Sequence, residues 1–146
     1  MTRLRYFRSR HGDDEPLQVV AAAVVRDRKL LLVSKTAAPT VFYLPGGKPE
    51  DGEEPLATLA REVCEELGVA IVEAEHFALV RDRAALEDRA MEMDVFLTAV
   101  DGEVNPRAEI AAVAWIGGTD TAPRTLAPAI RNHVIPQLMA LDLVDS

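Results

Sequence analysis

The sequence predicts one domain of the α/β or α+β class, built from several strands and two helices. Apolar residues recur at helical spacing over residues 54–67 and 122–143, and short apolar, β-rich runs occupy much of the remaining chain. A length of 146 residues fits one domain, and an apolar fraction of 49% is enough to bury a core. We expect residues 17–146 to form this domain. Residues 1–16, where four arginines precede three acidic residues, are expected to form a mobile or loosely packed arm.

The first two predicted strands form a hairpin. Residues 18–26 are rich in valine, and Asp27 and Arg28 make a plausible tight turn into a second apolar run at residues 30–34. Proline and glycine residues mark the interruptions that follow. The other predicted strands are residues 41–44, 69–72, 76–80, 92–100 and 110–116, and the predicted loops are residues 37–40, 45–47, 49–52 and 81–89.

Two helices are predicted from the apolar periodicity. In residues 54–67, Pro55 suits the first helical turn, and Gly68 stands where a left-handed residue commonly ends a helix. The second helix, residues 122–143, contains Pro136, which we expect to kink or split it because proline lacks the backbone N–H.

Charge and composition exclude several classes of function. The formal net charge is −8, whereas passive binding to nucleic acid requires a basic surface, so no nucleic-acid partner is expected. No apolar run approaches the ~20 residues of a membrane-spanning helix, so no membrane partner is expected. Cys64 is the single cysteine, which rules out an internal disulfide and fits a cytoplasmic protein. A homodimer is an open alternative.

The residues that carry chemistry are concentrated in the segment GKPEDGEEPLATLAREVCEELGV, residues 47–69. An α-helix turns about 100° per residue, so Glu62, Glu65 and Glu66 fall within a sector of roughly 100° beside the apolar stripe. Like charges at this spacing repel one another, and a hard divalent cation with oxygen ligands removes that repulsion. Mg²⁺ is the natural partner of carboxylates and phosphates together, and Mn²⁺ is its expected substitute. The alternative is a solvated acidic helix face.

The same segment resembles the signature of the Nudix hydrolases, of the MutT-like kind. The spacing from Gly47 through Glu53 to Arg61 and the eight residues after it matches that signature, with every defined position filled. The preceding letters FYLPGGK resemble the family's lead-in, although a Trp is common where Phe42 stands. The resemblance implies an α/β/α sandwich, with a mixed sheet flanked by the motif helix and a C-terminal helix. It also implies Mg²⁺-dependent hydrolysis of the phosphate chain of a nucleoside diphosphate derivative.

The resemblance also implies roles for the charged residues of the motif. One group binds the metal and another orients the site or activates water. The Gly46 carbonyl, Glu65 and Glu66 are implied metal ligands, Glu62 is implied to activate the water or to be a ligand itself, and Arg61 is implied to pair with Glu53 and orient the glutamates.

Four residues outside the motif helix are further candidates, each with two interpretations. Lys48 meets a substrate phosphate or is simply solvated. Phe42 and Tyr43 stack on a base or sugar, or belong to the core. Glu109 is an accessory base or metal ligand, or a surface residue at the start of a strand.

The substrate is the least determined part of the prediction. The Pro-Gly-Gly-Lys lead-in and the small size resemble family members that convert nucleoside triphosphates, including oxidised purine nucleotides, to monophosphates. ADP-ribose, other nucleotide sugars and dinucleoside polyphosphates are the alternatives, and loops such as residues 81–89 are expected to decide among them. A non-catalytic Nudix-like binding module is a third hypothesis, which the retained glutamates disfavour.

Overall fold

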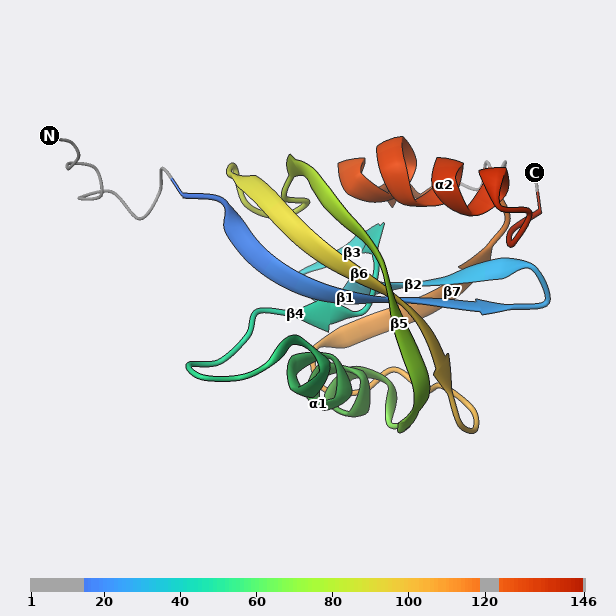
Figure 1. Ribbon diagram of the computed structural model, residues 1–146, viewed down its shortest axis with the longest axis horizontal. Helices are drawn as coiled ribbons and strands as arrows, with labels where there is room; N and C mark the ends of the chain where they lie inside the picture. The colour runs from blue at the N-terminus through green and yellow to red at the C-terminus, as the bar shows by residue number, and fades with distance from the viewer. Residues whose placement is uncertain (1–14, 119–123, 146) are drawn as a thin grey trace, which may run out of the picture.

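A curled mixed sheet separates two helical layers in the computed structural model, which describes residues 15–118 and 124–145. Helix α1 (Pro55–Leu67) lies along one face of the sheet, and the C-terminal helical segment lies along the other (Figure 1). This arrangement confirms the α/β/α sandwich expected from the sequence. No helix within the described residues is long and apolar enough to cross a membrane.

The sheet contains both parallel and antiparallel pairs. Its path runs β5-β6-β1-β2-β3-β8, with β4 paired to β1 and β7 paired to β2. The β1–β6 and β3–β8 pairs are parallel, and the others are antiparallel. The strands are β1 (Leu17–Arg26), β2 (Lys29–Lys35), β3 (Ala38–Tyr43), β4 (Gly46–Gly47), β5 (Ile71–Arg83), β6 (Ala90–Val100), β7 (Ile110–Ile116) and β8 (Thr125–Leu126).

Each face of the sheet has its own apolar core. Successive side chains of a strand point to opposite faces, so Leu31 and Val33 of β2 pack on the α1 side while Leu30 and Leu32 pack on the C-terminal side. Strand β1 is buried on both faces and contributes to both cores in the same alternating way. The central strands therefore anchor both helical layers at once.

The β1–β2 hairpin confirms the predicted turn. Asp27 and Arg28 have φ angles of 51° and 62°, the left-handed values that a two-residue hairpin turn of this kind requires. Val25 pairs with Leu30 across it. The positive φ at these two residues follows from the turn geometry.

Several sequence predictions about strands and loops are wrong. Residues 38–40 belong to β3 and Gly46–Gly47 form β4, although both lie in segments predicted to be loops. The two short strands expected at residues 69–72 and 76–80 are a single strand, β5, which also takes in the first three residues of the expected 81–89 connection. Two register irregularities along β5 explain the error, because each one shifts the apolar alternation from one side to the other.

The C-terminal helix is shorter than predicted, and it changes from π-helical to α-helical geometry along its length without a break. Residues 125–126 form β8, a π-helical turn spans Ile130–Val134, and α2 follows at Ile135–Ala140. Pro136, which has no backbone N–H to donate, is in the first turn of α2, directly after the π-helical turn. The arm predicted at residues 1–16 lies almost wholly outside the described residues, as do residues 122 and 123 of the predicted helix.

Candidate active site

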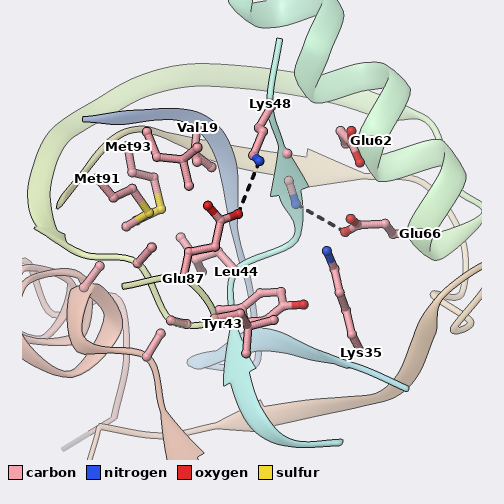
Figure 2. A pocket seen from close by; sticks show the side chains of 18 of the residues that line it. Val19, Lys35, Tyr43, Leu44, Lys48, Glu62, Glu66, Glu87, Met91 and Met93 are labelled. Atoms are coloured by element: carbon pink, nitrogen blue, oxygen red, sulfur yellow. Dashed lines mark hydrogen bonds and ion pairs between the residues drawn. The ribbon is translucent and has the colours of Figure 1, made fainter. Parts of the chain in front are cut away.

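A cavity of about 380 Å³ lies between α1 and β4 on one side and strands β1 and β6 on the other (Figure 2). One end is polar and is formed by β4, the loop after it and α1. The other end is mainly apolar, with Glu87 as a charged member, and is formed by β1, β6, the β5–β6 connection and the start of the C-terminal helical segment. The polar end contains Gly46, Gly47, Lys48, Arg61, Glu62 and Glu66; the apolar end contains Leu17, Val19, Leu44, Ala84, Met91, Met93 and Ile130.

Helix α1 carries two of the predicted glutamates into this cavity. Its apolar side buries Leu59, Val63 and Leu67 completely against the sheet. Glu62 and Glu66 lie at the margin of that buried side, so docking of the helix forces them inward. Glu66 is only 3% exposed, and the Glu62 side chain is 16% exposed.

The buried Glu66 carboxylate is poorly compensated. The backbone N–H of Gly46 donates to its Oε1 at 3.2 Å. Burial, reinforced by the nearby Glu62 carboxylate, nevertheless raises the pKa of Glu66 to about 8. A carboxylate in this environment is stabilised in its ionised form by a nearby cation.

Close packing explains the two glycines of β4. A Cβ on Gly46 would lie 2.1 Å from the Val20 carbonyl oxygen, and Gly46 has a φ of 152°. A Cβ on Gly47 would lie 2.4 Å from a carboxylate oxygen of Glu62. Gly46 therefore permits the pairing of β4 with β1, whereas Gly47 leaves space for a functional side chain.

Arg61 connects the loop after β4, Glu53 and the glutamates of α1 through its hydrogen bonds. It donates to both oxygens of Glu53, at 2.9 and 2.8 Å, and to Glu62 Oε2 at 2.9 Å. It also donates to the Lys48 carbonyl at 3.2 Å, which ties the loop after β4 to α1. Its guanidinium, helped by the Glu50 N–H and the Thr58 hydroxyl, lowers the pKa of Glu53 to about 2. The pairing expected between Arg61 and Glu53 is thus present as a fork-to-fork ion pair.

The third glutamate of the motif faces outward. The Glu65 side chain is 56% exposed and accepts a hydrogen bond from Arg61 at 3.5 Å. Within residues 15–118 and 124–145, no three acidic, histidine or cysteine side chains converge closely enough to hold an ion as they stand. The acidic side chains of the cavity offer oxygen ligands, and the attraction of Lys35 does not offset the burial of the Glu66 carboxylate. The residues present therefore fit a hard divalent cation.

The other predicted residues divide between the cavity and the core. Phe42 is 8% exposed in the core on the C-terminal side, with the Arg124 guanidinium 5.4 Å from its ring centroid, and it does not line the cavity. Tyr43 does line the cavity, and its buried hydroxyl has no hydrogen-bond partner among the described residues. Lys48 and Glu109 also line it; they pair with Glu87 at 3.3 Å and with Lys35 at 3.8 Å, respectively.

Sequence reasoning did not single out three of the charged residues that line the cavity, Lys35, Glu50 and Glu87. Lys35, at the end of β2, helps to lower the pKa of Glu66, although burial outweighs its effect. Glu87 lies in the β5–β6 connection, a loop that was expected to influence selectivity without a residue being named. Cys64 is exposed on α1.

The comparisons with known proteins agree with this architecture. The model of the NUDIX domain matches residues 16–138, which is most of the chain. The chain belongs to the NUDIX domain family. It is therefore a Nudix hydrolase, an enzyme that hydrolyses phosphoric anhydride bonds, and members of this family generally use a divalent metal ion.

Individual relatives place this Nudix domain near MutT-type enzymes. A Mycobacterium tuberculosis protein named "Putative 8-oxo-dGTP diphosphatase 2" is 32% identical over 120 residues, covering 80% of this chain and 84% of the relative. The crystal structure of a MutT Nudix hydrolase from Burkholderia pseudomallei has a TM-score of 0.67 at 29% identity, covering 89% and 98% of the two chains. The solution structure of the E. coli ORF135 protein has a TM-score of 0.70 at 26% identity, covering 90% and 94%.

Proposed function

We propose that this Nudix hydrolase converts a nucleoside triphosphate, including oxidised purine forms, to the monophosphate and pyrophosphate. The observation that carries the proposal is the two-part cavity, in which carboxylates and Lys48 line one end and apolar side chains line the other. A phosphate chain fits the first environment and a nucleobase fits the second. The name of the mycobacterial relative supports an oxidised purine nucleotide as substrate.

We assign the metal site to Glu62, Glu65, Glu66 and the Gly46 carbonyl, with Mg²⁺ as the ion and Mn²⁺ as a substitute. The buried Glu66 carboxylate with its raised pKa, and the half-buried Glu62 carboxylate beside it, support this assignment. Glu65 points outward and bonds to Arg61, so it has to turn inward to join the others. Bound there, the ion would neutralise phosphate charge and acidify an attacking water.

The side chains of the site then divide the remaining work. Glu62, oriented by the Arg61 guanidinium, accepts the proton of the attacking water. The water oxygen forms a new bond to phosphorus, the phosphoric anhydride P–O bond breaks, and pyrophosphate leaves with the electron pair. Lys48 binds a phosphate oxygen of the substrate. Glu109 lies on the cavity wall beside Lys35, where it serves as an accessory ligand or base. Glu53 acts through Arg61 as a positioning residue.

Net charge and cysteine content support a proposal for the binding partner and the cellular compartment. The net charge of −8 disfavours nucleic acid as a partner, so a small nucleotide is the proposed ligand. A single exposed cysteine fits a reducing cytoplasm, and we place the enzyme there.

The test is a hydrolysis screen with identified products. Purified protein is incubated with Mg²⁺ and a panel of 8-oxo-dGTP, dGTP, ADP-ribose, a nucleotide sugar and a dinucleoside polyphosphate. We expect 8-oxo-dGTP to be cleaved to its monophosphate and pyrophosphate with the highest kcat/KM of the panel, and excess chelator to abolish the reaction. Preferred cleavage of ADP-ribose or another diphosphate diester would refute the substrate assignment. No turnover of any nucleotide would favour a binding module.

A further inference from the structure

An ion pair lies within the cavity. Lys48 follows β4 and Glu87 lies in the β5–β6 connection, so the two residues come from different segments of the cavity lining. Lys48 Nζ lies 3.3 Å from Glu87 Oε1, and Figure 2 shows this contact spanning the cavity between the motif loop and the apolar compartment. The cation expected to meet phosphate therefore already has an anionic partner.

The main chain of Lys48 is fixed while its side chain is free to change partner. The Lys48 carbonyl accepts a hydrogen bond from Arg61, which ties that position to α1. The two side chains are 59% and 41% exposed, and an exposed ion pair of this kind contributes little to stability. Exchange of Glu87 for another anion thus needs only a side-chain rotation.

We propose that Glu87 gates the phosphate-binding position of Lys48, so that a substrate enters by replacing the Glu87 carboxylate with one of its phosphate oxygens. The inference rests on the proposed function, in which Lys48 binds the phosphate chain. The ligand class is a polyanionic phosphate chain, which brings more charge to Lys48 than one carboxylate does. Ligand binding breaks the Lys48–Glu87 ion pair, and the ion pair forms again when the ligand leaves.

Competition from the Glu87 carboxylate should weaken substrate binding by a measurable amount. Glu87→Gln removes the competing charge and keeps the side-chain size, so both the KM for the nucleotide and the Kd for inorganic pyrophosphate in Mg²⁺ buffer should fall. The expected change is about two- to fivefold, the size typical of an exposed ion pair, with kcat moving less than KM. High salt should shrink the gain because it screens the pair.

The adjacent Asp88 offers a matched control. It belongs to the same connection, is fully exposed, pairs with Arg83 and does not line the cavity. Asp88→Asn makes the same change in net charge one residue away and should leave KM and Kd unchanged. Lys48→Gln should weaken binding, and Glu87→Gln should bring no further gain in that background.

The outcomes separate the gate from the proposed function. Tighter binding in Glu87→Gln that disappears in the Lys48→Gln background supports the gate. An equal gain in Asp88→Asn, an equal gain without Lys48, an unchanged Kd or weaker binding in Glu87→Gln would each overturn it. If the wild-type protein hydrolyses no nucleotide, the proposed function fails, while pyrophosphate calorimetry on wild type, the three single variants and the Lys48→Gln/Glu87→Gln double variant still decides whether Glu87 competes for Lys48.

Discussion

Glu66 is packed against the backbone of Gly46, with the Gly46 N–H donating to Glu66 Oε1 at 3.2 Å and only 3% of the glutamate exposed. An acidic side chain is held here in a position that disfavours its ionised form. Such an arrangement is expected where chemistry is retained at the expense of stability.

We expect Glu66→Gln to nearly abolish turnover without destabilising the metal-free protein. The amide keeps the shape of the carboxyl group, and at a pH where Glu66 is ionised it also relieves repulsion from Glu62 of roughly 0.2–0.5 kcal/mol per pair. Turnover should fall on the order of 100-fold or more, because the charge that holds the metal is lost. Thermal unfolding with chelator and initial rates with saturating Mg²⁺ measure the two effects. Glu103→Gln, on an exposed loop, is the silent control. Earlier unfolding of Glu66→Gln by several degrees, or near wild-type turnover, would contradict the assignment.

The stability of the metal-free protein should depend on pH through Glu66. Its pKa is about 8 in the folded protein against an ordinary value of 4.5. The folded state therefore keeps this proton over a range in which the unfolded state loses it. The contribution to folding is greatest at acid pH, declines as pH rises from about 4.5 to 8, and is constant above that. Unfolding midpoints measured with chelator from pH 5 to 9 should fall more steeply for wild type than for Glu66→Gln. Parallel curves would show that Glu66 titrates normally.

The two glycines of β4 should give different phenotypes when changed to alanine. The Cβ of Gly46→Ala meets the Val20 main chain, which cannot move without disturbing β1, so folding stability should drop. The Cβ of Gly47→Ala meets the end of the flexible Glu62 side chain, so the fold should survive while kcat falls. Unfolding midpoints and initial rates of both variants test this division. An equal loss of stability in Gly46→Ala and Gly47→Ala would show that the two glycines do not have separate roles.

Tyr43→Phe should leave the unfolding temperature unchanged or slightly raised. The Tyr43 hydroxyl is buried without a partner among the described residues, and an unsatisfied buried polar group carries a desolvation cost. Ser34→Ala removes a second unpartnered buried hydroxyl, away from the cavity, and is the matched comparison. Destabilisation by more than about 1 kcal/mol in Tyr43→Phe would show that this hydroxyl is hydrogen-bonded in solution.

The sequence predicted the parts of the site that depend on local spacing. The helix over residues 55–67 and the inward position of Glu62 and Glu66 follow from a single periodicity. Adjacent strand residues point to opposite faces, so Phe42 and Tyr43 were never equivalent candidates, and the structure buries the first while the second lines the cavity.

The other half of the cavity depends on contacts between distant segments. Glu87 approaches Lys48 because of the length and register of β5 and β6, and two irregularities in that register conceal the strand pattern from a single sequence. Glu65 lies about 60° farther round α1 than Glu62, away from the buried side, so it faces outward beside Arg61.

The division of the cavity into a polar and an apolar end has a consequence for how this enzyme can change. The groups proposed to break the anhydride come from α1 and β4, whereas the apolar wall comes from β1, β6 and the β5–β6 connection. Substitutions at Val19, Met91 or Ala84 can therefore reshape the space beside a base without displacing a glutamate. Substrate preference can therefore change by mutation, in evolution or in a selected library, while the residues proposed for hydrolysis stay the same.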